Sequence, residues 1–120
     1  MPEIKDKKYG KTLFFIDGNE IKDKKYGTTL FYIDGSEIKE KSKYGTVKFY
    51  INGNEVREKS KYGNIRYIID RNEVKEKSKY GSLRYYIDGS EIKDKEYGNV
   101  KYYIDGSLTK DQLYGFLSII

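Results

Sequence analysis

The chain has 120 residues, of which 37% are hydrophobic and 36% are charged, with a net charge of +5 and 14 tyrosines. It contains no cysteine and no histidine, which excludes disulfides, thiolate metal sites and histidine-based catalysis. The length fits a single domain, and the moderate positive charge favours anionic partners without requiring them.

The first ten residues, MPEIKDKKYG, lack the apolar segment of a signal peptide. No later stretch reaches the roughly 18 apolar residues of a membrane span. These features predict a cytoplasmic protein without a membrane span. A chain from which a signal peptide had been removed would show the same features.

Six tandem units of 17 or 18 residues make up most of the chain. They span 3–19, 20–36, 37–54, 55–72, 73–90 and 91–107. The first two units differ only at Lys11/Thr28, Phe15/Tyr32 and Asn19/Ser36, which indicates duplication of a module. Each unit contains an aromatic and β-branched run, which an Asp-Gly or Asn-Gly pair interrupts in five of the six units.

These pairs predict β-hairpins, because a type I′ turn requires positive φ at both of its central positions. In the third unit, a turn at Asn52-Gly53 would pair Phe49 with Val56. A second turn at Ser60-Lys61 would then pair Val56 with Ile65. Both kinds of connection work as hairpins, so we expect an antiparallel meander of about a dozen strands.

The alternation of side chains gives this sheet two faces. Face A is apolar and collects Val47, Phe49, Ile51, Val56, Ile65, Tyr67, Ile69 and Val74. Face B carries Tyr50, Tyr62, Tyr80, Tyr86 and Tyr103 among Lys48, Glu55, Arg57, Lys59, Arg66 and Lys75. A flat sheet cannot bury face A alone, so the sheet must curl into a barrel or solenoid, pair with a second copy, or be covered. We expect an all-β fold with a single-layer, curled or solenoid-like sheet.

The last segment, SLTKDQLYGFLSII, departs from the repeat. Thr109 and Gln112 match a capping box, which predicts a short helix from about Lys110. We therefore expect a repeat domain at 1–107 and a C-terminal helical cap at 108–120 that closes the open end of the repeats. The alternative is a contact between copies through an apolar stripe formed by Leu113, Phe116, Leu117 and Ile120.

Residues 97–107, YGNVKYYIDGS, combine a glycine, an aromatic pair and an Asp-Gly turn. This stretch resembles the MORN-type hairpin repeat, including related antitoxin-like bacterial proteins, and it also resembles the choline-binding repeat of cell-wall-binding proteins. The likeness extends over the six units, residues 3–107. It implies stacked tandem hairpins. Choline or lipid binding is not carried over, because the wall-binding pattern relies on tryptophan and this chain has none.

Carboxylates recur in every unit. The turn acids Asp17, Asp34, Asp70, Asp88 and Asp105 would line one sheet edge, where Ca²⁺ binding is one interpretation and turn formation is the simpler one. The glutamates after each turn would face basic residues, as Glu55 would face Arg66, and this favours ion pairs over catalysis. No acid pair stands out as unique, so we predict a non-enzymatic protein with no cofactor and no metal site.

Face B and the irregular fourth unit carry the candidate binding residues. Lysine and arginine among tyrosines can bind phosphates while bases stack on the rings, although the same mixture is common on sheet surfaces. In the fourth unit Ile68 replaces the face-B tyrosine and Arg71 replaces the turn glycine, which indicates either drift or an interface anchor. The candidates are Tyr50, Arg57, Arg66, Ile68, Arg71, Arg84, Tyr86 and Tyr103.

These features predict an interaction protein that presents a broad sheet surface to a macromolecular partner, with a protein as the first candidate. The composition suits a bacterium or its phage, where inhibition of a host factor is a fitting role. The alternatives are binding of nucleic acid or another polyanion along face B, and binding of carbohydrate or cell wall through Tyr50, Tyr86 and Tyr103. Self-association through face A or the C-terminal helix would form a homo-oligomer.

Overall fold

The computed structural model describes residues 1–120 and contains twelve β-strands and one α-helix. The strands are β1 (Glu3–Lys5), β2 (Thr12–Asp17), β3 (Glu20–Lys22), β4 (Thr29–Asp34), β5 (Glu37–Glu40), β6 (Val47–Asn52), β7 (Glu55–Glu58), β8 (Ile65–Asp70), β9 (Glu73–Glu76), β10 (Leu83–Asp88), β11 (Glu91–Lys93) and β12 (Val100–Asp105). The helix is α1 (Lys110–Ile119). The predicted antiparallel meander and the short C-terminal helix are confirmed.

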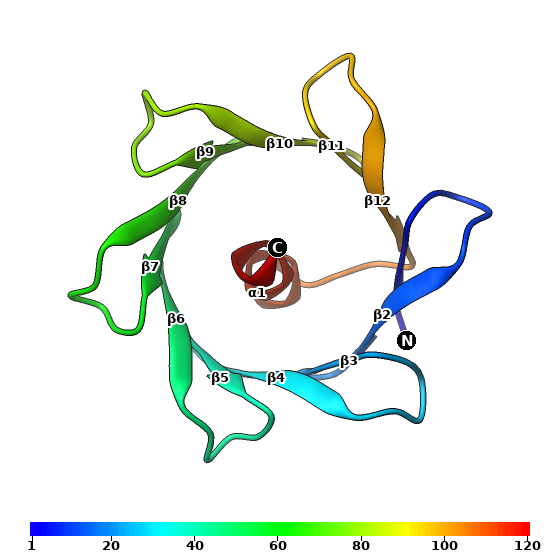
Figure 1. Ribbon diagram of the computed structural model, residues 1–120, viewed down its shortest axis with the longest axis horizontal. Coiled ribbons are helices and arrows are strands. Elements are labelled where there is room, and N and C mark those ends of the chain that lie inside the picture. Colours follow the sequence, from blue (N-terminus) through cyan, green and yellow to red (C-terminus); the bar gives the residue numbers. More distant parts are fainter.

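The strands form one closed antiparallel barrel, because β1 pairs with β12 as well as with β2 (Figure 1). Of the alternatives that the sequence left open, the sheet forms the barrel, so the expectation of a curled or solenoid-like sheet is wrong. A register shift interrupts each of the six pairings joined by a longer loop and none of those joined by a two-residue turn. Such bulges bend strands, so one bulge in each hairpin curves the meander until its ends meet. Closure leaves no strand edge unpaired.

The tight turns lie one residue later than the sequence suggested. Asn52 pairs with Glu55, so the two turn residues are Gly53 and Asn54. Gly53 has a φ of 64°, whereas Asn54 does not have a positive φ. Positive φ at the first central position alone is the pattern of a type II′ turn, in place of the expected type I′ turn.

The pairing register differs from the prediction on both sides of β7. Val56 pairs with Ile51 rather than with Phe49, and on its other side it pairs with Tyr67 rather than with Ile65. Each partner moves by two positions, and residues two apart in a strand share a face. The incorrect register therefore leaves Val56 and its partners on the face that was predicted for them.

Two rings of side chains line the barrel interior. The aliphatic ring contains Ile4, Ile16, Ile21, Ile33, Ile38, Ile51, Val56, Ile69, Val74, Ile87, Ile92 and Ile104. The neighbouring aromatic ring contains Phe14, Phe31, Phe49, Tyr67, Tyr85 and Tyr102. Face A is thus confirmed as the core-facing side for all its predicted residues except Val47 and Ile65, which lie beyond the bulges and outside the core.

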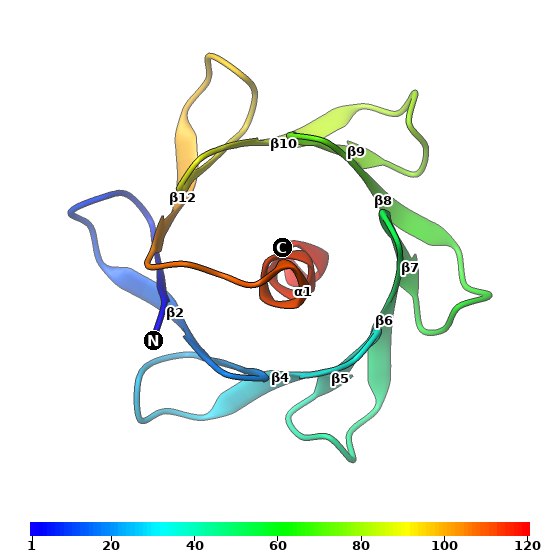
Figure 2. The same ribbon diagram turned by 180° about the vertical axis from the view of Figure 1, so that it is seen from behind.

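Helix α1 occupies the centre of the barrel (Figures 1 and 2). Phe116 and Leu117 are fully buried. The ring of Phe116 meets the rings of Phe14 and Tyr102 edge-on, with both centroid distances at 5.4 Å. The helix and the strands therefore share one hydrophobic core.

This position corrects the prediction of a cap on an open end. Leu113 and Ile120 are half-buried, while Phe116 and Leu117 have no exposed surface that could contact a second copy. The wall approaches the helix so closely that a Cβ atom on Gly115 would lie 2.9 Å from Ile33 Cδ1. The apolar stripe therefore fills the barrel rather than closing its end.

Polar contacts fix both ends of the helix. The predicted capping box is confirmed, because Gln112 N donates to Thr109 Oγ1 and Thr109 N donates to Gln112 Oε1. Gln112 Nε2 also donates to Gly18 O in the first tight turn, at 2.9 Å. At the other end Arg66 Nε donates to Ser118 O at 3.1 Å, where a cation also complements the helix dipole.

Strand β1 completes the sixth hairpin from the other end of the chain. After Asp105 the chain turns inward to α1, and β1 occupies the position that follows the tight turn in the other hairpins. Lys5 Nζ lies 3.0 Å from Asp105 Oδ2, as Lys39 Nζ lies 2.9 Å from Asp34 Oδ2 within the β4–β5 hairpin. The pairing of β1 with β12 thus reproduces the contacts of a continuous hairpin.

Candidate functional site

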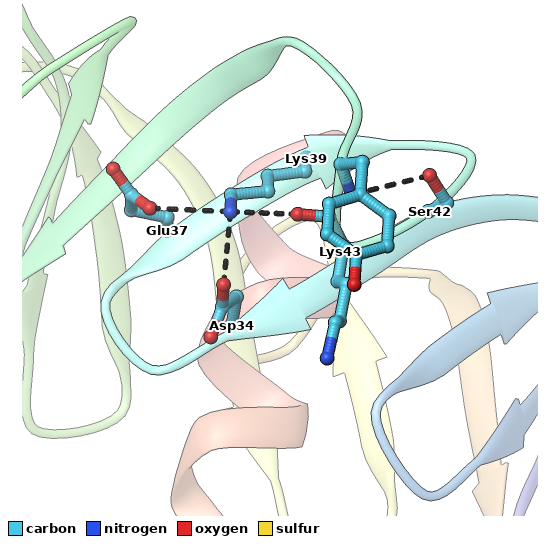
Figure 3. Close-up of polar contacts among 6 residues, drawn as sticks. Asp34, Glu37, Lys39, Ser42 and Lys43 are labelled. Carbon is cyan, nitrogen blue, oxygen red and sulfur yellow. Dashed lines mark hydrogen bonds and ion pairs between the residues drawn. The ribbon is translucent and has the colours of Figure 1, made fainter.

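The outer face of the wall carries a repeated cluster of charges, shown for β4 and β5 in Figure 3. Lys39 Nζ lies 2.9 Å from Asp34 Oδ2 and 3.6 Å from Glu37 Oε1, and it donates to the loop carbonyl of Lys43 at 2.8 Å. Equivalent pairs join Lys5 to Asp105, Lys22 to Asp17, Lys75 to Asp70 and Lys93 to Asp88. The turn aspartates are therefore ion-paired.

These contacts hold the groups in their charged forms. The hydrogen bond from Lys39 lowers the pKa of Asp34 below its ordinary value of 3.8, and the same bond raises the pKa of Lys39 above 10.5. The pKa of Lys93 is raised in the same way by its hydrogen bond to Asp88. Such groups neither release nor take up protons near neutral pH, so they suit a scaffold better than acid–base catalysis.

Five of the eight predicted partner-binding residues lie on this outer face: Tyr50, Arg57, Ile68, Tyr86 and Tyr103. All five are half-buried or buried. Arg57 donates to Glu55 Oε1 at 2.8 Å and to Gly63 O at 3.0 Å, so the predicted pairing of Glu55 with Arg66 is wrong. Because its charges are already bound, this face offers less to a partner than the sequence suggested.

Arg71 lies apart from the others, at the first position of the tight turn between β8 and β9. Its φ of 59° falls within the 58° to 64° range of the glycines at the same position in four other turns. The turn therefore keeps its geometry despite the strain that positive φ imposes on a side chain. The exposed Arg71 lies at the turn end of the barrel.

Arg66 and Arg84 lie at the mouth, which we define as the end of the barrel where α1 ends. The guanidinium of Arg66 stacks over Phe49 and Tyr67, at 5.1 and 4.8 Å from the ring centroids. Arg84 Nη1 lies 3.0 Å from Glu76 Oε1. The prediction that both line face B is wrong, because each is the residue that a bulge leaves without a partner, and bulges redirect side chains.

The mouth has an apolar and a polar sector. Leu13 and Leu30 occupy, in the first two units, the position held in the later units by Lys48, Arg66, Arg84 and Lys101. A depression of ≈ 500 Å³ adjoins the polar sector, and its lining includes Arg66, Arg84, Glu58 and Glu76. Both signs of charge line this depression, so it has no strong preference for an anionic or a cationic ligand.

The most accessible aromatic residues lie on what we call the rim, the six longer loops that radiate from the barrel (Figure 1). These loops are 6–11, 23–28, 41–46, 59–64, 77–82 and 94–99. Each carries one tyrosine that is 84% to 91% exposed: Tyr9, Tyr26, Tyr44, Tyr62, Tyr80 and Tyr97. In five loops the preceding lysine places Nζ 5.1 to 5.6 Å from the ring centroid, and the sixth loop has Glu96 there.

Local backbone chemistry fixes how the tyrosines are presented. The glycine after each tyrosine has no room for a Cβ atom, which would collide with the Asp6 side chain at Gly10 and with the Glu40 carbonyl at Gly45. In the third loop Tyr44 N donates to Ser42 Oγ at 3.2 Å. The repeated Tyr-Gly pair therefore reflects a requirement of the loop backbone as well as an exposed ring.

The sequence-based predictions missed the rim as a unit. They placed Tyr62 and Tyr80 on face B and did not include Tyr9, Tyr26, Tyr44 or Tyr97 as candidates. A signal was present, because every unit has Lys-Tyr-Gly or Glu-Tyr-Gly just before its alternating strand run. A tyrosine fixed beside a glycine, outside the alternating run, indicates a loop tip.

Comparison of the chain with family models, curated proteins and solved structures finds no match. The resemblance to MORN-type and wall-binding repeats therefore stays a sequence-based prediction. The single helix is too short and too polar to cross a membrane. The structure itself is a closed barrel of six hairpins around a central helix, with a rim of six loops.

Proposed function

We propose that this chain is a non-enzymatic binding protein that holds a macromolecular partner at its rim. The observation that carries the proposal is the set of six tyrosines, each 84% to 91% exposed on a loop that radiates from one barrel. Rings so exposed contribute little to the fold, and tyrosine is enriched where proteins meet partners. Repetition of this feature in all six units favours multivalent contact.

The residue chemistry supports a role without catalysis. The chain has no histidine or cysteine, and its recurring carboxylates, such as Asp34, are held by lysines. Acid–base or nucleophilic catalysis needs a distinct group of residues at one place, whereas these clusters repeat around the wall. The proposed role requires no cofactor and no metal ion.

Three classes of partner were predicted from the sequence. The sequence-based prediction put a protein first, such as a host factor inhibited by a bacterial or phage protein, with nucleic acid and carbohydrate as alternatives. All three classes stay predictions. The candidate surface moves from the broad sheet to the rim, because the outer face is half-buried and ion-paired while the rim tyrosines are exposed.

Photo-crosslinking tests the proposal for a macromolecular partner of any class. A photoreactive residue would replace Tyr62 on the rim in one variant and Asn54, exposed at a tight turn, in a matched control. After irradiation in an extract of cells that make the protein, we expect crosslinked macromolecules at position 62 and none at position 54. Equal yields at both positions, or crosslinks at position 54 alone, would contradict the proposal.

A further inference from the structure

We infer that the rim binds single-stranded nucleic acid, whose phosphates follow the ring of loop lysines while its bases stack on the six rim tyrosines. This inference rests on the proposed function and names the partner class of the same surface. It stands on the distribution of charge, on the pairing of lysine with tyrosine, and on the curvature of the rim.

The positive charge of the protein is concentrated on the rim. The six loops contain 12 of the 24 basic residues but only 4 of the 19 acidic ones, so the loops carry +8 and the remainder of the chain carries −3. None of the twelve loop lysines forms an ion pair, whereas wall lysines such as Lys39 and Lys93 do. The rim is thus a belt of unpaired ammonium groups around a wall whose charges are largely neutralised.

Five of the six loop tips combine the two groups that nucleic-acid binding requires. In the fourth loop Lys61 Nζ lies 5.1 Å from the ring centroid of Tyr62, and the ring is 84% exposed. A phosphate bound to the ammonium group would leave the attached base beside the ring, where stacking does not depend on base identity. Four other loops repeat this arrangement.

The shape of the rim favours a flexible single strand of nucleic acid over a stiff duplex. The molecule measures 39 by 37 Å across and 16 Å in thickness. Six tips on a circle of that size lie roughly 20 Å apart. A stretched single strand covers roughly 6 Å per nucleotide, about twice the spacing in a duplex, so about three nucleotides span two tips and about 18 complete the circuit. Duplex DNA is too stiff to follow such a curve and would reach only one or two tips.

The same geometry argues against a protein partner. The exposed large hydrophobic residues are Met1 and the six rim tyrosines. Stable protein interfaces usually centre on a contiguous desolvated patch with clustered anchors. Rings spaced roughly 20 Å apart around a circle cannot form such a patch, but a polymer that passes over them in turn can use them all.

Fluorescence anisotropy with labelled oligothymidylates of 6, 12, 18 and 24 nucleotides tests the inference. We expect affinity to rise with length up to about 18 nucleotides and then to level off, and a duplex of the same length to bind more weakly. If about six phosphates are neutralised, the affinity for the 18-mer falls about 300-fold between 50 and 200 mM salt. An abasic strand of equal length should bind at least about 10-fold more weakly, because stacking is lost.

Variants separate the two parts of the site. Changing all six rim tyrosines to serine should weaken binding at least about 10-fold without changing the salt dependence, whereas changing them to phenylalanine should leave it unaltered. Changing Lys8, Lys25, Lys43, Lys61 and Lys79 to glutamine should flatten the salt dependence. Glu96→Lys, which gives the sixth loop the missing lysine, should tighten binding. As a control, glutamine at Lys48 and Lys101 in the mouth should change little.

Three results would overturn the inference: no binding of the 18-mer at 50 mM salt, binding that the serine variant leaves intact, or binding that the mouth control abolishes. Crosslinks from position 62 to a protein, together with no oligonucleotide binding, would overturn the inference and leave the proposed function standing. Absence of both would overturn the two together. Thermal unfolding of each variant confirms that losses come from the rim and not from misfolding.

Discussion

Tyr67 and Tyr62 lie five residues apart, yet their side chains are 3% and 84% exposed. Tyr67 belongs to the aromatic ring inside the wall, where its ring packs in the core beneath Arg66. Tyr62 stands on the rim beside Lys61, which has no ion-pair partner. Both positions combine an aromatic ring with a cation, but Arg66 also donates a hydrogen bond to Ser118 O of the central helix, whereas Lys61 contacts the exposed ring beside it. The wall therefore maintains the structure, and the rim is available to a partner.

The largest expected contrast comes from removing one aromatic ring from each region. Phe116→Ala empties the centre of the core and should lower the free energy of unfolding by about 3 to 5 kcal/mol. Tyr62→Ala should change it by less than about 0.5 kcal/mol, because the lost ring is solvent-exposed. Chemical denaturation of both variants measures the difference, and comparable losses would remove the distinction between wall and rim.

Within the wall, the joint between β1 and β12 should be as strong as a continuous hairpin. Ile4 in β1 and Ile21 in β3 are both fully buried in the aliphatic ring. If the ring unfolds as one cooperative unit, Ile4→Ala and Ile21→Ala should each lower the free energy of unfolding by about 2 to 5 kcal/mol and differ by less than about 1. A much smaller loss for Ile4→Ala would mean that β1 detaches before the barrel unfolds.

Removing one cation from the wall and one from the rim should show the same difference in stability. Arg66→Ala removes the hydrogen bond to Ser118 O and two ring contacts, so we expect a loss of about 1 to 3 kcal/mol. Lys61→Ala should alter stability by less than about 0.5 kcal/mol. The melting temperatures of the two variants measure these changes in stability. An equal loss for Lys61→Ala and Arg66→Ala would contradict the claim that the rim lysines contribute little to the fold.

The tight turns offer a gain in stability. Arg71 holds a φ of 59° that glycine adopts without strain, so Arg71→Gly should raise the free energy of unfolding by about 0.5 to 1 kcal/mol. Denaturant titration at constant pH tests this expectation. A loss of stability would mean that the arginine side chain makes a contact worth more than the strain.

The smallest effect concerns the ion pairs of the outer face. The folded state lowers the pKa of Asp34, so its contribution is present above pH 3.8 and is lost as the pH falls through the lowered value. It raises the pKa of Lys39, so that contribution is present below pH 10.5 and is lost as the pH rises through the raised value. The melting temperature should therefore be highest between these limits. In Lys39→Met it should fall less steeply at either pH extreme. An identical profile in that variant would contradict the assignment.

Local chemistry allowed much of the fold to be predicted from the sequence. The six hairpin units, the core-facing side and the capped helix all follow from periodicity and from short motifs such as Thr109 to Gln112. Closure did not follow, because it depends on six bulges in the strand pairings, whose positions the sequence does not reveal. The position of the helix inside the barrel was not predicted either, because an apolar stripe can pack inside a closed barrel as well as against the open end of a sheet.

The candidate site was harder to predict than the fold. Face B was expected to gather Tyr50, Arg66 and Arg84, but bulges move both arginines to the mouth and ion pairs occupy the outer face. Simple alternation of side chains cannot anticipate a bulge, because the extra residue changes which side chains share a face. Tyr62 was assigned to a strand because a turn was predicted at Ser60-Lys61, whereas the loop extends over 59–64.

Backbone amide shifts provide the most direct test, because the two glycine families report on opposite parts of the barrel. Gly10, Gly27, Gly45, Gly63, Gly81 and Gly98 lie on the rim, while Gly18, Gly35, Gly53, Gly89 and Gly106 lie at the tight-turn end. On titration of the ¹⁵N-labelled protein with an 18-nucleotide oligothymidylate, the rim glycines should shift together and the turn glycines should stay in place. Shifts confined to the turn glycines, or to the mouth around Arg66, would contradict a partner-binding rim.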